Sequence, residues 1–335
     1  MMFDRLEGSH SGMGREWGRR LRESGVLLER AVPFPVTRER RAFAEACLPH
    51  YRKHFPRALE ELRGLADGQG CGEEFLRAAL FSIYAMPPGA RCSCFAVSSG
   101  EAVLLGRNSD FLTAQERGCC HLTCRPAEGY AFLGNTTSFI QMEDGVNQRG
   151  LAVGLTSAAP GEIRPGLNAG MLLRLMLETC ASTAEALTLL ERVPIASAQT
   201  FTLADPSGEI AVAECCALGM KILRPAAGAP FVCAVNRFES PEMRPLSGPC
   251  PDDWEAGPRL AVMKSALARL APSINEEEAR AILSGQHGFL CQYDRRTGRD
   301  TVWAAVYDLK GRVCSLAPGN PGRCGFPVTE GFPQP

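Results

Sequence analysis

The sequence predicts a mainly antiparallel α+β protein. Three observations support this class: strand patterns are paired by tight turns, helical patterns come in separate blocks, and no strand–helix–strand alternation recurs along the chain. The 335 residues are 45% hydrophobic and 22% charged, which is an ordinary globular composition. A chain of this length can bury a large core, in one large domain or two smaller ones.

The first ninety residues have a helical pattern. Residues 36–65 carry apolar side chains at helical spacing among many Arg and Glu, and residues 73–84 repeat the pattern. Pro87, Pro88 and Gly89 are expected to end the last of these helices. We therefore expect the whole N-terminal segment to be helical.

From Cys92 the apolar period changes to that of β-strands. The pattern predicts strands at residues 92–97 and 102–107 around a Ser-Ser-Gly-Glu turn. Later elements follow the same signals: hairpins at 201–203 with 210–214 and at 301–307 with 312–316, helices at 169–179, 183–192, 259–270 and 275–283, and a Pro/Gly-rich loop at 241–258.

Charge, hydropathy and cysteine usage argue against several classes of function. The formal net charge is -1, so no basic surface is expected for nucleic acid or an anionic membrane. The apolar run at residues 170–177 contains Arg174 and is far shorter than the roughly 20 residues of a membrane span. Residues 1–25 lack the apolar core of a secretory signal. The fifteen cysteines are therefore expected to be mostly buried, reduced thiols in the cytoplasm.

The hairpin that begins at Cys92 is expected to place a cation beside a thiol. With Ser99 and Gly100 at its centre, Cys92 lies opposite Arg107, with the Cβ atoms about 4.5–5.5 Å apart. A neighbouring guanidinium lowers a thiol pKa from its usual value of about 8.5. In this register Asp110 lies beyond the end of the partner strand and can fold back over it. The same geometry also fits a buried small residue that faces a surface arginine.

Four motifs in order resemble those of the N-terminal-nucleophile (Ntn) hydrolases. Cys-Ser-x-Phe at Cys92, a turn, and Gly-Arg-Asn-x-Asp-Phe are similar to the start of the catalytic chain in isopenicillin-N acyltransferase-like enzymes. That autoproteolytic C45 family is related to choloylglycine hydrolases and penicillin V acylases. Residues 144–153 (DGVNQRGLAV) resemble its Gly-x-Asn-x-x-Gly-Leu-Ala segment, and Asn236 and Arg259 follow at a strand end and a helix start. The resemblance covers roughly residues 72–322.

The resemblance implies a four-layer αββα Ntn sandwich at residues 92–335, preceded by a helical propeptide at residues 1–91. The precursor is expected to cleave itself between Arg91 and Cys92. The new N-terminal Cys92 would then supply a thiol nucleophile and an α-amine base, whose pKa of about 7.7–8.0 suits proton transfer near neutrality. The implied reaction is hydrolysis or transfer of an acyl group at a linear amide, through an acyl-thioester and without a cofactor.

The resemblance also implies roles for the matched residues. Asp110 holds the α-amine, and Arg107 favours the thiolate. Asn236 donates to the developing oxyanion, and Arg259 supports the site electrostatically. Where bile-salt-hydrolase relatives carry a second oxyanion asparagine, this chain has Thr156, whose hydroxyl or a backbone N–H could serve.

Purely structural roles for these residues also fit the sequence. Arg107 could pair with Asp110 alone, and Asn236 could simply satisfy a strand end. Asn147, a weaker candidate for supporting the site, lies in a Gly-x-Asn turn and is expected to be mainly structural. Cys94 falls opposite Leu105 in the expected register and is interpreted as a packing residue.

Two other classes of function are possible. Cys119, Cys120, His121 and Cys124 offer four soft ligands for zinc or an iron–sulfur cluster, but neighbours on a strand point to opposite faces. A family member that no longer cleaves would be a small-molecule binding module, which the bulky Arg91 before Cys92 leaves open. The expected partner is a small-molecule or peptide amide, with no nucleic acid or membrane, and a homo-oligomer is possible.

Overall fold

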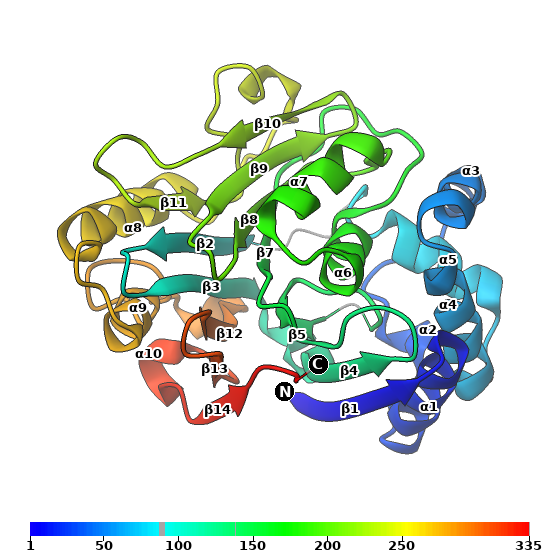
Figure 1. The fold of residues 1–335 in the computed structure, drawn as a ribbon. Helices are drawn as coiled ribbons and strands as arrows, with labels where there is room; N and C mark the ends of the chain where they lie inside the picture. The colour runs from blue at the N-terminus through cyan, green and yellow to red at the C-terminus, as the bar shows by residue number, and fades with distance from the viewer. Residues whose placement is uncertain (87–90, 138, 335) are drawn as a thin grey trace.

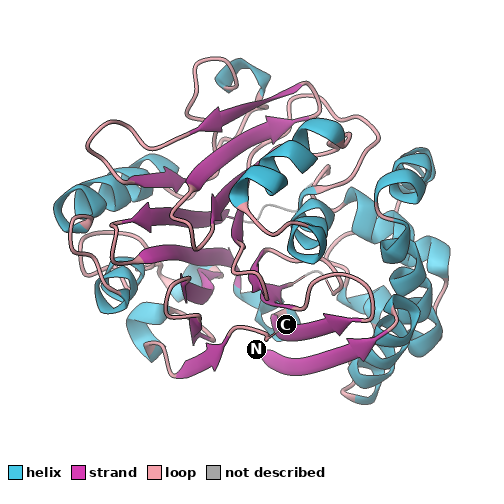
Figure 2. Ribbon diagram, viewed as in Figure 1, coloured by secondary structure: helices cyan, strands magenta, loops and turns pink. Residues whose placement is uncertain are grey.

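The chain folds into two β-sheets with helices on both outer faces, as Figures 1 and 2 show. The computed structural model describes residues 1–86, 91–137 and 139–334. The expected helix stop at 87–89 lies outside the described residues. In chain order the elements are β1 (Met2–Gly8), α1 (His10–Glu23), α2 (Leu28–Ala31), α3 (Arg38–His54), α4 (Pro56–Gln69), α5 (Glu73–Ser82), β2 (Arg91–Ser98), β3 (Val103–Leu112), η1 (Thr113–Gly118), β4 (Cys120–Pro126), β5 (Phe132–Thr136), β6 (Asp144–Asn147), β7 (Ala152–Ser157), α6 (Ala169–Thr179), α7 (Thr183–Arg192), β8 (Gln199–Ala204), β9 (Ile210–Cys216), β10 (Gly219–Leu223), β11 (Phe231–Ala234), η2 (Arg244–Leu246), α8 (Ala256–Leu270), α9 (Glu276–Leu283), η3 (Arg295–Thr297), β12 (Arg299–Asp308), β13 (Val313–Ala317), α10 (Pro321–Cys324) and β14 (Val328–Gly331).

The sheets have eight and six strands. The first runs β1-β4-β5-β6-β7-β8-β9-β10, and the second runs β11-β2-β3-β12-β13-β14. Among the described strands only β1 and β4 pair in parallel, and all other pairs are antiparallel. The mainly antiparallel α+β class predicted from the sequence is therefore confirmed.

Strand alternation divides the apolar side chains among three main clusters. Helices α1 to α7 share the largest cluster with the outer face of the eight-stranded sheet. A second cluster fills the space between the sheets, and a third lies between the six-stranded sheet and α8 and α9. On β2, Cys94 and Ala96 face the inter-sheet cluster, whereas Phe95 and Val97 face the helices. The hairpin that begins at Cys92 thus lies inside the molecule, covered on both faces.

Most predicted elements are observed close to their expected bounds. The helices at 169–179 and 183–192 and the three predicted hairpins are present. The expectation of an entirely helical N-terminal segment is wrong at its start, because Met2–Gly8 is a strand that pairs with β4. This seven-residue strand has few apolar residues, so its pairing rather than its own pattern determines its structure. Within the described residues, no helix combines the length and hydropathy required to cross a membrane.

Glycines allow α1 and α4 to approach each other at backbone distance. A Cβ atom at Gly64 would lie 2.1 Å from the Ser11 carbonyl oxygen, and one at Gly14 would lie 2.0 Å from the Glu61 carbonyl oxygen. The N-terminal segment is therefore a closely packed helical unit that is also joined to the eight-stranded sheet through β1.

Candidate active site

Cys92 and Arg107 lie on the same face of the β2–β3 hairpin, but not directly opposite each other. The ladder pairs Cys92 with Ser109, and Cys94 with Arg107, so the predicted register is wrong by two residues. The turn runs from Ser99 to Ala102, whose backbone groups bond at 2.9 Å, and this moves its centre along the chain. Because the shift is even, every side chain keeps its predicted face. Arg107 Nη2 reaches Cys92 Sγ diagonally and donates to it at 2.9 Å.

The thiol of Cys92 is fully protonated near neutrality in this form of the chain. Burial raises its pKa to about 11, although Arg107 lowers it. The net lowering that the sequence predicts is therefore not observed. The main reason is the burial of the thiol, and the charges of Glu143 and Asp110 add to it. Arg107 also binds two carboxylates: its Nη1 lies 2.7 Å from Asp144 Oδ2 and its Nη2 lies 3.5 Å from Glu143 Oε2.

Asp144 fixes the position of the Arg107 guanidinium between the two sheets. Its carboxylate accepts hydrogen bonds from Trp303 Nε1 at 2.8 Å, from the Tyr307 hydroxyl at 2.5 Å and from Asn135 Nδ2 at 2.5 Å. Both Asp144 and Arg107 are completely buried. Gly154 makes room for this arrangement, because a Cβ atom there would lie 2.5 Å from Cys94 Sγ and 3.4 Å from Arg107 Cδ.

Glu143 is a second buried carboxylate next to Cys92. Its Oε1 accepts from the backbone N–H of Thr137 at 3.0 Å and from the Thr137 hydroxyl at 2.5 Å. Its Oε2 faces Arg107 Nη2, the same nitrogen that contacts Cys92 Sγ. Glu143 and Cys92 therefore share one guanidinium nitrogen, and the Glu143 charge raises the thiol pKa.

Asp110 lies within the hairpin ladder, opposite Arg91, and not beyond its end as predicted. It accepts from Thr301 Oγ1 at 2.6 Å and from the Tyr293 hydroxyl at 3.1 Å, and Arg259 Nη1 lies 3.5 Å away. A register shift in β12 between Thr301 and Trp303 directs Thr301 to this carboxylate. Burial raises the pKa of Asp110 to about 6, against the lowering effect of Arg259.

Asn236 and Arg259 bind the backbone of Cys92. The Cys92 N–H donates to Asn236 Oδ1 at 2.8 Å, and Asn236 Nδ2 donates to the Ser157 carbonyl oxygen at 2.9 Å. Arg259 Nη1 donates to the Cys92 carbonyl oxygen at 2.6 Å and to Ser93 Oγ at 2.8 Å, and its Nη2 donates to Asn236 Oδ1 at 3.1 Å. Asn236 and Arg259 thus define the geometry of the peptide group that begins the predicted catalytic chain.

The loop before α8 orients Arg259. The carbonyl oxygens of Asp253 and Trp254 accept from its guanidinium at 3.0 and 2.9 Å. Trp254 and Glu255 have φ values of 52° and 59°, a left-handed conformation that is unusual for two consecutive non-glycine residues. Such backbone persists only where the surroundings determine it, and it is common at functional sites.

The weaker candidates Thr156 and Asn147 bond to other partners. The Thr156 hydroxyl donates to the Val235 carbonyl oxygen at 2.9 Å and lies 2.6 Å from Thr200 Oγ1. Asn147 Nδ2 donates to two carbonyl oxygens near the end of α6, at 2.9 and 2.8 Å. Its Oδ1 accepts two backbone N–H groups of its own turn, at 3.0 and 3.1 Å. Asn147 therefore joins the β6–β7 turn to α6.

A cavity of about 190 Å³ lies beside the Cys92 peptide group. Asn236, Ser157 and the loop around Cys250 contribute to its lining, and so does Arg91. The Arg91 Nη2 donates to the Asp252 carbonyl oxygen at 2.6 Å and to Cys250 Sγ at 3.3 Å. Space for a small group thus exists next to the proposed scissile bond.

The cysteine-rich stretch at residues 119–124 does not gather its side chains at one point. Cys119 belongs to the inter-sheet cluster, whereas Cys120 and Cys124 belong to the helix-side cluster. His121 bonds Asn135 Oδ1 at 2.8 Å and Glu330 Oε2 at 3.0 Å. This is the alternation expected of strand neighbours. All fifteen cysteines lie in the described part of the chain and are free thiols.

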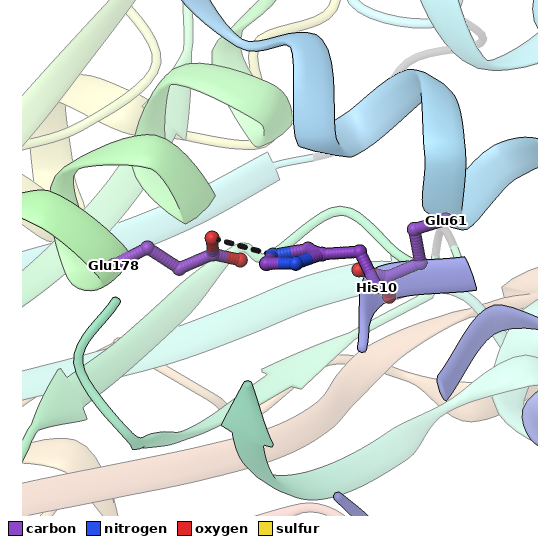
Figure 3. Close-up of side chains that lie close together, drawn as sticks. All are labelled: His10, Glu61 and Glu178. Atoms are coloured by element: carbon purple, nitrogen blue, oxygen red, sulfur yellow. Dashed lines mark hydrogen bonds and ion pairs between the residues drawn. The ribbon is translucent and has the colours of Figure 1, made fainter. Parts of the chain in front are cut away.

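Another group of potential metal ligands is His10, Glu61 and Glu178, shown in Figure 3. His10 Nε2 lies 2.9 Å from Glu178 Oε2. Arg174 lies between the two carboxylates, with its Nη2 2.7 Å from Glu61 Oε2 and its Nε 2.6 Å from Glu178 Oε1. Because a guanidinium already occupies both carboxylates, this is a buried ion-pair network that joins α1 and α4 to α6.

Sequence reasoning identified Cys92, Arg107, Asp110, Asn236 and Arg259, and the structure brings all five together. The sequence analysis missed Asp144 and Glu143, the two carboxylates that bind the Arg107 guanidinium. Asp144 stood inside a matched motif and Glu143 directly before it, so their charge was an available signal. Tyr293 and Thr301 have no comparable signal, because only the fold brings them to Asp110.

Comparisons with known proteins show the family of the chain and proteins of similar fold. A family model described as acyl-coenzyme A:6-aminopenicillanic acid acyl-transferase matches residues 97–323. No curated protein matches the sequence. An N-acylethanolamine-hydrolyzing acid amidase ortholog from Caenorhabditis elegans has a similar fold, with a TM-score of 0.51 and 16% identity over 72% of this chain and 100% of that chain.

Two further solved structures are similar at lower scores. Penicillin V acylase from Agrobacterium tumefaciens has a TM-score of 0.45 and 17% identity, over 68% of this chain and 82% of that one. A variant of the conjugated bile acid hydrolase from Clostridium perfringens has a TM-score of 0.47 and 13% identity, over 73% of this chain and 97% of that one.

Proposed function

The chain belongs to the acyl-coenzyme A:6-aminopenicillanic acid acyl-transferase family, and on that premise we propose that it is a cysteine-dependent Ntn amidohydrolase or acyltransferase. Its substrate is a linear N-acyl amide. The observation that supports this best is the convergence on Cys92: Arg107 bonds its sulfur, Asn236 its amide nitrogen and Arg259 its carbonyl oxygen. We also infer that the two sheets and their outer helices are the αββα sandwich of Ntn enzymes.

Self-cleavage between Arg91 and Cys92 is the first step of the proposal. Cys92 Sγ attacks the Arg91 carbonyl carbon, the C–N bond breaks, and the thiol proton ends on the departing nitrogen. Water then hydrolyses the Arg91 thioester, which releases the Arg91 carboxylate and regenerates the thiol. Cys92 retains a free α-amine.

The charges around Cys92 favour such an amine. Three buried carboxylates, Glu143, Asp144 and Asp110, face two guanidinium groups, Arg107 and Arg259. When the α-amine of Cys92 accepts the thiol proton, the ammonium group that forms would supply the missing positive charge, and burying unbalanced charge is costly.

In turnover the α-amine accepts the thiol proton as Sγ attacks the substrate carbonyl, and it returns that proton to the leaving amine. Asn236 Oδ1, which accepts the Cys92 N–H in the intact chain, continues to orient this nitrogen. Asn236 Nδ2 has two N–H groups, and the one not bound to Ser157 donates to the oxyanion. Water completes hydrolysis, and an amine or thiol completes acyl transfer.

Residues 1–91 are proposed to stay bound after cleavage. The strand β1 pairs with β4 over its full length, a buried hydrogen bond connects His10 to α6, and a buried ion pair connects Glu61 to α6. These contacts do not depend on the Arg91–Cys92 bond, so the two fragments would remain one folded unit. The free thiols suit a reducing compartment, in agreement with a cytoplasmic protein.

The alternative is an unprocessed binding module that keeps the fold without the chemistry. The protonated thiol and the Arg91 side chain beside the cavity are compatible with it. A panel of N-acyl amides tests the choice, with amine release and the acyl adduct on Cys92 followed by mass spectrometry. The enzyme should form an adduct on Cys92 that is absent from Cys92→Ala and retained in Cys94→Ala. Complete lack of adduct and amine release in wild type would support the binding module.

A further inference from the structure

A second cavity lies between residues 2–33 of the N-terminal segment and residues 114–139. Cys92 is not among its lining residues. It has a volume of about 330 Å³, within the range of small-molecule sites. Residues 25–27 and 30–33 contribute to the lining, and so do residues 114, 115, 117 and 118. Apolar side chains, including Leu21, Val32 and Phe139, make up much of the lining.

The charged residues of this lining have one sign. Arg30 comes from α2 and Arg117 from η1, and the lining contains no Asp or Glu. Two other cavities combine arginines with glutamates, Arg5 with Glu330 in one and Arg295 with Glu116 in the other, whereas the cavity beside Cys92 also has an arginine and no acidic residue.

Neither guanidinium of the cavity bonds to a protein group within the described residues. The nearest carboxylate to Arg117 along the chain, Glu116, is paired with Arg295 at 2.5 Å. Two exposed arginines from different elements are thus available to an anionic group, next to an apolar surface. Arginine binds carboxylates in a bidentate geometry.

We propose that this cavity binds an aliphatic chain that ends in a carboxylate, with the carboxylate between Arg30 and Arg117 and the chain against the apolar lining. Two sources share this chemistry: a free carboxylate, or the far end of the substrate's acyl group. The second source rests on the proposed function and the first does not.

The structure connects the cavity with the nucleophile. Thr137 and Phe139 line it together with a smaller neighbouring space of about 20 Å³, whose lining has no charged residue and includes Leu80 and Phe111. Thr137 also donates to Glu143, which shares Arg107 Nη2 with Cys92. Hydrogen bonds therefore link the wall of this cavity to a neighbour of Cys92, although the cavity shares no lining residue with the one beside the Cys92 peptide group.

Calorimetric titration of the full-length protein with octanoate, octan-1-ol and octylammonium tests the proposal. Octanoate should bind more tightly than either comparison ligand, and added salt should weaken only its binding among these three. A variant with Arg30→Gln and Arg117→Gln should lose roughly tenfold in octanoate affinity or more, and keep its affinity for octan-1-ol. A matched variant with Arg149→Gln and Arg192→Gln, which alters two exposed arginines outside the lining, should bind like wild type.

Absence of octanoate binding, equal binding of octylammonium, or equal loss in the matched variant would each overturn the proposal. To separate the sources, N-acyl amides with and without a terminal carboxylate on the acyl chain are compared in turnover. A preference for the carboxylate that the Arg30/Arg117 variant loses identifies the acyl end of the substrate. Octanoate binding without that preference identifies a free carboxylate. The titration needs no turnover, so failure of the proposed activity leaves it interpretable.

Discussion

Two buried arginines of this molecule have similar surroundings but differ in one partner. Arg107 lies next to Asp144 and Glu143, and Arg174 lies next to Glu61 and Glu178. Each is almost completely shielded from water, and each joins parts of the chain that are distant in sequence. Burial and charge therefore do not separate the candidate site from the rest of the core.

The two arginines differ in the groups that accept their hydrogen bonds. Arg174 donates to its two carboxylates and to the Ile140 carbonyl oxygen, which are unreactive partners. Arg107 gives one nitrogen to a thiol, and only part of its charge remains for that thiol after Asp144 and Glu143 are satisfied. A functional role is thus indicated by a reactive partner within the network, and the comparison predicts different consequences for disrupting each one.

The largest effect on stability is expected from Arg174→Met. It leaves Glu61 and Glu178 buried without their cation, which costs about 3–5 kcal/mol of unfolding free energy. Urea unfolding followed by circular dichroism measures the change, with exposed Arg192→Met as the control. A loss below about 1 kcal/mol would mean that this network does not hold the N-terminal segment in place.

Asn236→Ala should act on chemistry instead. It removes the acceptor of the Cys92 N–H and the proposed oxyanion donor, so self-cleavage should slow by roughly 10²–10³. A time course of intact mass after expression measures the rate, and Asn147→Ala is the matched control, since Asn147 bonds to α6 and its own turn. Cleavage of Asn236→Ala within tenfold of wild type would remove Asn236 from the mechanism.

Asp110 should make stability depend on pH. Its pKa is raised to about 6 in the fold from an ordinary 3.8, so the folded chain binds an extra proton between these values. This contribution is complete below about pH 4 and is lost as the pH rises through 6, with a total on the order of 3 kcal/mol. Unfolding curves between pH 4 and 7 should therefore be flatter for Asp110→Asn than for wild type. Parallel curves would show that Asp110 titrates normally.

The smallest expected effect is on the thiol itself. Glu143→Gln removes the carboxylate that raises the Cys92 pKa and keeps an acceptor for Thr137, so the pKa should fall by roughly one unit from about 11. The pH dependence of Cys92 alkylation, read from its tryptic peptide, measures it. Glu162→Gln, an exposed carboxylate, is the control. An unchanged or higher pKa would show that Glu143 does not act on the thiol through the shared guanidinium.

Much of the fold could be predicted because its elements have strong local patterns. The helices at 169–179 and 183–192 begin at Asn168 and Ser182, whose side chains cap them, so sequence alone locates their start. The strand at Met2–Gly8 could not be predicted, since its seven residues form a strand only through pairing with β4. The hairpin register was wrong because a four-residue turn and a two-residue turn differ little in sequence.

The candidate site also has a part that the sequence predicts and a part that it does not. Its five matched residues lie in motifs with recognisable spacing, and they meet in the structure. The thiol pKa could not be predicted, because it depends first on the burial of Cys92 and then on the charges of Arg107, Glu143 and Asp110 around it. Both the burial and these charges come from several strands, which no single stretch of sequence encodes.

Intact-mass analysis of freshly purified protein tests the central claim most directly, with Cys92→Ala and Cys94→Ala beside wild type. The proposal predicts that wild type and Cys94→Ala break between Arg91 and Cys92 into two fragments that co-purify, whereas Cys92→Ala stays whole. An intact wild type with no thiol-dependent amidase activity would contradict the proposal and leave a binding protein with the fold of an enzyme.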